Sequence, residues 1–115
     1  MAVKNISQEL EQHPEGTFLS LIDFNDSSIG ACCITGESPV WEMHPDTDEF
    51  FHVLEGNFSI TLLEESGAKV YEVPAGSVFV VPKGIWHKPS APAGVKFLYF
   101  TPGESLHSEA DDPRQ

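Results

Sequence analysis

Basic residues are scarce in this chain of 115 residues, which has 6 Lys and Arg against 18 Asp and Glu and a formal net charge of −12. The few basic residues are scattered along the sequence and form no cluster. Proteins that bind nucleic acid use clustered Lys and Arg to contact phosphates. We therefore expect no nucleic-acid partner, and we attribute the acidic excess to solubility.

Long apolar runs are also missing, and no stretch is long enough to span a bilayer, so we expect no membrane partner. Residues 1–13 lack the basic-then-apolar layout of a secretory signal. The only two cysteines, Cys32 and Cys33, are adjacent and cannot build a disulfide framework. Reduced thiols fit a cytoplasmic protein, and a secreted protein whose signal has been removed is the alternative.

Short strand patterns recur along the chain, with Gly, Pro, Asn and Asp at the breaks between them. About eight such strands with tight turns predict an all-β sandwich or barrel. One stretch, residues 6–13, is typical of a short helix, with Ser7 as its N-cap. The expected strands are residues 17–24, 29–35, 40–44, 49–55, 58–63, 69–73, 77–81 and 95–101.

The length predicts one domain over residues 1–115. We divide it into an N-terminal segment (1–15), a barrel (16–103) and an acidic tail (104–115). The tail is expected to be loosely held unless it crosses the barrel mouth. A small core and an apolar first strand favour a homodimer, held by residues 17–24 and an adjoining sheet face.

Potential metal ligands fall in two short motifs. Glu42 and His44 are two residues apart, so on one strand they face the same side. A turn over residues 45–48 returns the chain, and Glu49 opens the next strand. With His87 from the second motif, two nitrogens and up to two carboxylates converge, which suits a divalent transition metal. His44, Glu49 and His87 alone would make a two-histidine, one-carboxylate site; the alternative is a metal-free polar cluster.

The spacing of these residues resembles the two motifs of the cupin superfamily. The first motif is G-x5-E-x-H-x4-E-x6-G over residues 36–56, and the second is G-x5-P-x-G-x2-H over residues 76–87. Residues 48–56 and 100–103 are similar to the mannose-6-phosphate-isomerase-like group of small cupins. The resemblance implies an all-β jelly roll (double-stranded β-helix), a homodimer and a divalent metal such as Mn, Fe, Ni or Zn in the barrel.

Two positions depart from the family pattern. Cupins usually have His at the position of Glu42 and Asn at the position of Ala91. Glu42 is therefore either a fourth metal ligand or a residue that points past the metal and acts as a base. At Ala91 the departure concerns an Asn side chain whose role in the family is structural.

Several side chains near the motifs are candidates for other roles. Phe51, Phe79 and Tyr99 are candidates to shape a substrate pocket, with Phe51 favoured because it shares the strand face of Glu49; core packing is the alternative. We expect His52 to face outward, at the surface or a dimer contact. His13 and His107 lie in the end segments and are expected to be solvated.

Three functions remain open from the sequence. The first is a metal-dependent enzyme that acts on a small organic molecule, with isomerase-like or oxygenase-like chemistry. The second is a barrel that binds a small molecule without turnover, and the third is a structural protein with a vestigial metal site. The fold does not decide among them.

Overall fold

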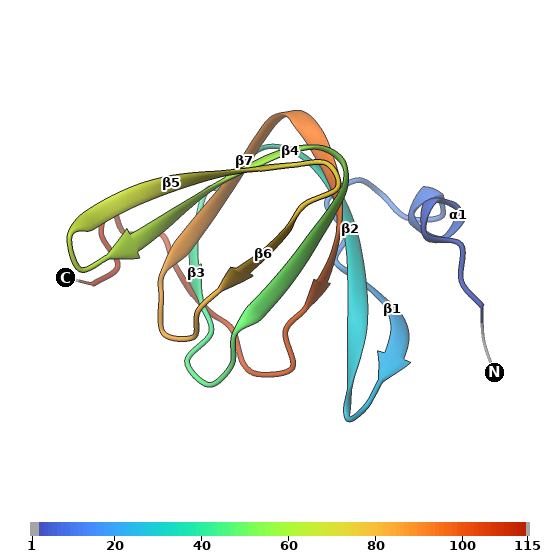
Figure 1. Ribbon diagram of the computed structural model, residues 1–115, viewed down its shortest axis with the longest axis horizontal. Coiled ribbons are helices and arrows are strands. Elements are labelled where there is room, and N and C mark those ends of the chain that lie inside the picture. The colour runs from blue at the N-terminus through green and yellow to red at the C-terminus, as the bar shows by residue number, and fades with distance from the viewer. Residues whose placement is uncertain (1–2, 115) are drawn as a thin grey trace.

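The structure is a computed structural model that describes residues 3–114. Antiparallel strands curl into one jelly roll, and the short helix α1 (Ile6–Glu11) lies at its N-terminal side (Figure 1). The sequence-based prediction of an all-β fold is therefore confirmed. The strands are β1 (Leu19–Phe24), β2 (Ser27–Glu37), β3 (Trp41–Met43), β4 (Glu49–Glu64), β5 (Gly67–Pro74), β6 (Val78–Val81), β7 (His87–Phe100) and β8 (Leu106–Ser108).

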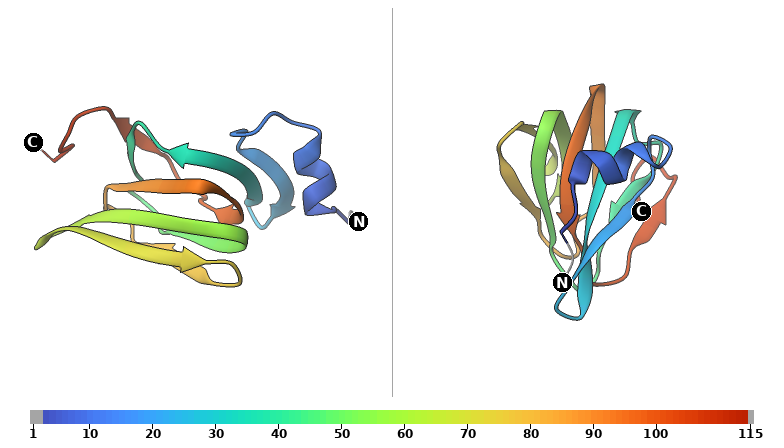
Figure 2. Two further views of the ribbon diagram at one scale, coloured as in Figure 1. Left: turned by 90° about the horizontal axis from the view of Figure 1, so that it is seen from above. Right: turned by 90° about the vertical axis from the view of Figure 1, so that its right-hand side faces the viewer.

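Two long strands, β4 and β7, organise the sheet. They pair with each other along most of their length. The first part of β4 also pairs with β6 and its second part pairs with β5, while β7 pairs with β2 and β3. Strand β1 extends the sheet beyond β2, and β8 extends it beyond β3. Because the sheet curls back on itself, its strands form layers, which Figure 2 shows from above and from the side.

The predicted break between residues 49–55 and 58–63 is not a turn, because both segments belong to β4. Gly56 instead bends the strand, with a φ of 81° and shifts in the register with β7 on either side of it. A Cβ at Gly56 would collide with the carbonyl oxygen of Gly94, itself at a positive φ inside β7. Glycine is therefore required where the two long strands bend together.

The two ends of the chain differ from the sequence prediction. Helix α1 ends at Glu11, and its N-cap is Asn5, whose side chain accepts a hydrogen bond from the Gln8 amide (3.0 Å), rather than Ser7. The tail contributes β8, a strand that the sequence pattern did not predict. In residues 3–114 no helix is long and apolar enough to cross a membrane.

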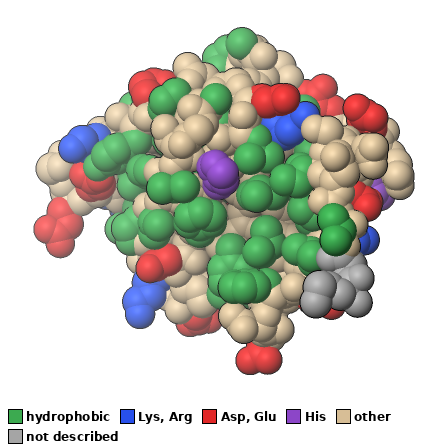
Figure 3. Space-filling view, turned by 45° about the vertical axis from the view of Figure 1, so that its right-hand side comes forward, with side chains coloured by type: hydrophobic (Ala, Val, Ile, Leu, Met, Phe, Trp, Pro, Cys, Tyr) green, Lys and Arg blue, Asp and Glu red, His purple; other side chains and the backbone are tan. Residues whose placement is uncertain are grey.

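The core lies between the curled halves of the sheet. The outer face of the strands also carries apolar side chains, which gather around a histidine on the face shown in Figure 3. In the strand register Val80 lies opposite Phe50, and Phe50 lies opposite Phe100, so these three form one row. The buried core cluster consists of Cys32, Phe51, Val53, Phe58, Ile60, Leu62, Val73, Val81, Ala91, Val95 and Phe97.

Candidate metal centre

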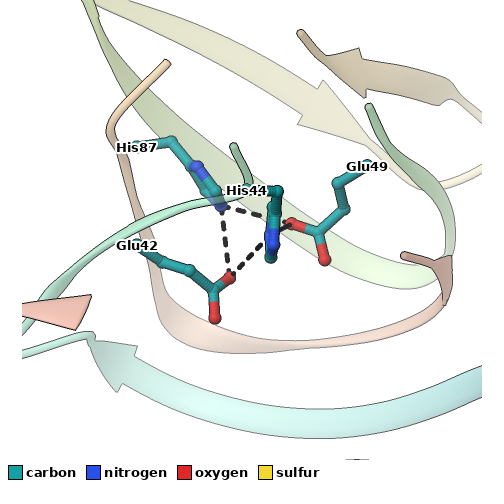
Figure 4. Close-up of side chains that lie close together, drawn as sticks. All are labelled: Glu42, His44, Glu49 and His87. Atoms are coloured by element: carbon teal, nitrogen blue, oxygen red, sulfur yellow. Dashed lines mark hydrogen bonds and ion pairs between the residues drawn. The ribbon is translucent and has the colours of Figure 1, made fainter. Parts of the chain in front are cut away.

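Four potential ligands meet inside the jelly roll, beside the short strand β3. Glu42 lies on β3, His44 follows it, Glu49 opens β4 and His87 opens β7 (Figure 4). Each residue offers one ligand atom, and these atoms all lie within 4.8 Å of one another. The structure thus brings together all four residues that the sequence singled out; that they bind a metal remains a prediction.

Backbone contacts between the two motifs explain this convergence. Glu42 lies directly opposite His87 in the pairing of β3 with β7. The Gly84 amide donates to the His44 carbonyl oxygen (2.8 Å), and Gly84 has a φ of 78°, which a residue with a side chain rarely adopts. The Lys83 amide donates to the Asp48 carboxylate (2.9 Å). The loop before His87 is therefore tied to the turn that carries His44 and Glu49.

The site is built around two carboxylate oxygens that face two ring nitrogens. Oε1 of Glu49 lies 3.1 Å from Nε2 of His44 and 3.2 Å from Nε2 of His87. Oε1 of Glu42 lies 3.3 Å from each of the same two nitrogens. Glu49 and both histidines are buried, whereas the Glu42 side chain is 30% exposed.

The remaining ring nitrogens orient the two imidazoles. Nδ1 of His87 lies 3.3 Å from the Ile85 carbonyl oxygen, and Nδ1 of His44 lies 3.2 Å from the Glu104 carbonyl oxygen. A carbonyl can only accept, so both Nδ1 atoms donate and both Nε2 atoms are directed to the centre. Metal-binding histidines use the same arrangement.

The donor set fits a divalent metal. Among residues 3–114, Nε2 of His87 is a buried nitrogen without a hydrogen-bond partner of acceptable geometry, although two carboxylate oxygens lie near it. Buried polar atoms are rarely left without a partner. Two imidazoles and two carboxylates are suitable ligands for Mn, Fe, Ni or Zn, and their two negative charges balance a divalent ion.

Without a metal, the four groups change one another's protonation. Burial alone would lower the pKa of His44 and His87, but the nearby carboxylates of Glu42 and Glu49 outweigh it and raise the pKa values to about 10 and about 9. Burial alone would raise the pKa of both carboxyl groups, but the two histidines hold the pKa of each below its usual value. In the metal-free protein both imidazoles are therefore protonated, and their positive charges balance the two carboxylates as a metal ion would.

A cavity of about 330 Å³ is lined by three of the four groups, namely Glu42, His44 and Glu49. Tyr99 lines it, although a role in substrate binding remains a prediction, and Phe18 packs edge-on against the Tyr99 ring (5.6 Å between centroids). Phe51 is instead buried in the core, and Phe79 packs against Tyr71 outside the cavity lining. Phe51 does point to the same inward face of β4 as Glu49, but at Phe51 this face lies in the core.

Three further residues contact the candidate ligands, and sequence reasoning did not identify them as contacts. The Thr101 hydroxyl donates to Oε2 of Glu49, and Oγ of Ser105 lies 3.0 Å from Nδ1 of His44. His107 was expected to be solvated; its side chain is 54% exposed, yet its Nε2 lies 2.9 Å from Oε2 of Glu42. Thr101 directly follows β7, whereas Ser105 and His107 lie in the polar tail, where no pattern distinguishes them from ordinary surface residues.

The fold and the cluster define a jelly roll with a His/Glu cluster that could hold a metal ion, beside a cavity. The family model described as "Cupin domain" matches residues 33–101, more than half of the chain. The chain therefore belongs to the cupin family.

Curated relatives match over part of their length. The "Uncharacterized protein YdbB" of Bacillus subtilis is 35% identical over 69 residues, which cover 60% of this chain and 58% of that protein. The 3-hydroxyanthranilate 3,4-dioxygenase of Brucella anthropi is 31% identical over 72 residues, which cover 60% of this chain and 40% of that enzyme. The matched region thus spans about half the length of these relatives.

Solved structures resemble this fold over most of the chain. A cupin-2 domain containing protein from Shewanella frigidimarina has a TM-score of 0.77 and 30% identity, and the match covers 87% of this chain and 94% of that one. The hydroquinone 1,2-dioxygenase of Sphingomonas sp. TTNP3 has a TM-score of 0.70 at 16% identity, with 83% of this chain and 70% of that chain covered. The second similarity concerns the fold alone.

Proposed function

We propose that this protein is a metal-dependent enzyme that binds a divalent transition ion through His44, Glu49, His87 and Glu42 and acts on a small organic molecule. The convergence of four ligand atoms within 4.8 Å beside an open cavity carries the proposal. A bound ion of this kind polarises substrate oxygens and, when redox-active, activates dioxygen.

The cavity favours a small substrate without a phosphate group. Its volume of about 330 Å³ is at the lower end for ligand pockets. The lining residues within the described part of the chain include no Lys or Arg to pair with a phosphate. This composition supports an oxygenase-like reaction over the sugar-phosphate chemistry that the mannose-6-phosphate-isomerase-like resemblance suggested. The name of the Brucella relative, a dioxygenase, supports the same choice.

Two aromatic residues that line the cavity would orient the substrate. Burial raises the pKa of Tyr99 to about 12, so its hydroxyl stays protonated and is available as a hydrogen-bond donor. Phe18 stands edge-on to Tyr99 at the cavity and is 64% exposed, so a planar apolar ligand would cover it. Together they offer an apolar wall with one polar handle.

Glu42 is better placed as a ligand than as a free base. Its Oε1 faces the two histidines together with Oε1 of Glu49, as Figure 4 shows. Its other oxygen is already held by His107. A base needs an oxygen free to take a proton from the substrate, so the contacts of both oxygens support a ligand role for Glu42 over a role as a base.

Elemental analysis of protein purified without a histidine tag tests the proposal, followed by titration of the metal-free protein with Mn, Fe, Co, Ni and Zn. We expect close to one ion per chain for the parent and for a His52→Ala control, and none for His87→Ala. Protein that takes up none of these metals has a vestigial site and refutes the proposal.

Oxygen consumption by the iron-loaded protein, measured with 3-hydroxyanthranilate and hydroquinone as probes, tests the reaction class. Dioxygen uptake that disappears in His87→Ala supports an oxygenase. Metal-loaded protein that binds these probes without consuming oxygen fits the non-catalytic binding barrel instead.

A further inference from the structure

The two oxygens of Glu42 face different partners. Oε1 lies 3.3 Å from Nε2 of His44 and 3.3 Å from Nε2 of His87, whereas Oε2 lies 2.9 Å from Nε2 of His107. Figure 4 shows the second oxygen turned away from the two inner histidines. The carboxylate is therefore fixed in one rotation, with a single oxygen toward the candidate metal centre.

Strand pairing places His107 at this point. Glu42 lies opposite His87 in the pairing of β3 with β7, and opposite His107 in the pairing of β3 with β8. Directly opposed residues on neighbouring antiparallel strands carry their side chains on the same face, a few ångströms apart. His87, Glu42 and His107 thus form one cross-strand row, and the backbone holds them in register.

The same C-terminal segment, residues 104–108, also contacts a second candidate ligand. The Glu104 carbonyl oxygen and the Ser105 hydroxyl lie 3.2 and 3.0 Å from Nδ1 of His44. Ser105 and His107 both line the cavity at the site. Two of the four candidate ligands are therefore held from outside by a segment that lies after the matched family region, which ends at residue 101.

Glu42 needs such a partner more than the other ligands do. Its side chain is 30% exposed, against 7% for Glu49, whose second oxygen accepts from Thr101. A partly exposed carboxylate on a long side chain has several accessible rotamers, and ordering it has an entropic cost. A donor fixed on the neighbouring strand removes that freedom before the ion arrives.

We propose that His107 is a positioning residue for the metal centre: its Nε2–H donates to Oε2 of Glu42 and keeps Oε1 directed at the ion. The inference rests on the proposed function, because it requires that Glu42 is a metal ligand. It adds that the C-terminal strand β8 is part of the metal centre.

The test uses the Co(II)-loaded protein, with two readouts: the rate of cobalt release to excess EDTA and the visible absorption of the bound ion. Outer partners of metal ligands typically contribute about 10- to 100-fold in affinity. For His107→Ala we expect release to be faster by about 10-fold, the lower end, because the contact is partly exposed. The absorption bands are expected to shift, because the Glu42 carboxylate changes its binding mode.

Substitutions at position 107 separate the hydrogen bond from packing. His107→Phe keeps a ring but removes the donor, and we expect it to behave like His107→Ala. His107→Gln keeps an N–H donor, and we expect it to recover most of the parent's release rate and spectrum. Leu106→Ala, on the same strand and with an exposed side chain, is the matched control and should leave both readouts unchanged.

A double-mutant cycle identifies the residue through which His107 acts. In a Glu42→Ala background, His107→Ala should have no further effect on release or spectrum. An equal effect in both backgrounds overturns the inference, as does parent-like behaviour of His107→Phe. Complete metal loss in His107→Ala would make His107 a ligand and overturns it as well. If the parent itself binds no metal, the proposed function fails; if the parent binds and His107→Ala changes nothing, only this inference fails.

Discussion

Replacing Glu42 with Gln tests the ligand set directly, because the change keeps the shape of the side chain and removes its charge. Structural sites with four ligands bind zinc with apparent free energies of about 10–16 kcal/mol. An equal share for one ligand is about 3 kcal/mol, which corresponds to about 100-fold in affinity. We therefore expect Glu42→Gln to bind Zn or Mn about 100-fold more weakly than the parent.

The geometry explains why an amide cannot replace the carboxylate. Oε1 faces the two inner histidines and Oε2 faces His107 at 2.9 Å, so both positions need an oxygen. An amide has one oxygen and one NH₂ group, which only donates. With its oxygen on the ion, the amide in Glu42→Gln pairs with His107 only if that imidazole changes tautomer, and the site keeps one uncompensated positive charge.

Competition with a chromophoric chelator measures this affinity for the parent, Glu42→Gln and Glu65→Gln. The last variant is the matched control, because Glu65 is exposed in the turn between β4 and β5 and its loss changes the net charge equally. Glu65→Gln should bind as the parent does. If Glu42→Gln also retains the metal as tightly as the parent, Glu42 is not a ligand and an open three-residue site is correct.

Other consequences of the structure can be measured independently. His44→Ala and His87→Ala should lose the metal more completely than Glu42→Gln, by elemental analysis, in protein whose circular dichroism is unchanged; retention in either variant would contradict the ligand set. In metal-free protein, the cluster should contribute most to the free energy of unfolding between about pH 4.5 and 6.5, the ordinary pKa values of its groups. Acid removes this contribution by protonating the carboxylates, whose pKa values are lowered, and base removes it by deprotonating the imidazoles, whose pKa values are raised. Urea unfolding at several pH values measures the free energy of unfolding, and the absence of such a maximum would contradict the prediction. Burial raises the pKa of Cys32 to about 12, so little of its reactive thiolate is present at pH 8. Iodoacetamide at this pH should therefore label Cys33 before Cys32, and equal labelling of the two by mass spectrometry would disprove this. Light scattering should show that the parent is a homodimer. Val80→Glu changes the apolar outer face and should produce a monomer, whereas Val70→Glu, at a similarly exposed position on β5, should leave the dimer intact. A monomeric parent would reject the predicted dimer.

The fold and the inner site were predictable because their signals are local and repeated. Strand patterns with glycines between them indicated an all-β fold, and the structure confirms it. The spacing of Glu42, His44 and Glu49 around one turn predicts that these three groups lie together, and they do. Strand lengths were less predictable, because Gly56 reads as a turn signal in sequence and acts as a bend inside β4 in the structure.

The substrate residues show a limit of arguments from strand parity. Phe51 faces inward as Glu49 does, but alternation along a strand gives the face and not the depth. Phe51 lies two residues after Glu49 on β4, and at this depth the inward face of the strand already belongs to the core. There Phe51 packs against Phe58 and Phe97. Phe18 lies at the cavity because the β1 region passes the mouth, a tertiary relation that no local pattern encodes.

The contacts from residues 104–108 were the least predictable for a related reason. The tail is polar and acidic, and composition alone favoured a loosely held segment. Its order comes from pairing with β3, where Trp41, Glu42 and Met43 lie opposite Ser108, His107 and Leu106. Such pairing depends on where the rest of the folded chain has brought the two strands, and backbone hydrogen bonds carry little side-chain signature. A short strand can therefore contact a candidate metal centre while its sequence resembles ordinary surface. Residues outside the family motif that contact such a site are best sought on the strands that pair with those carrying the candidate ligands.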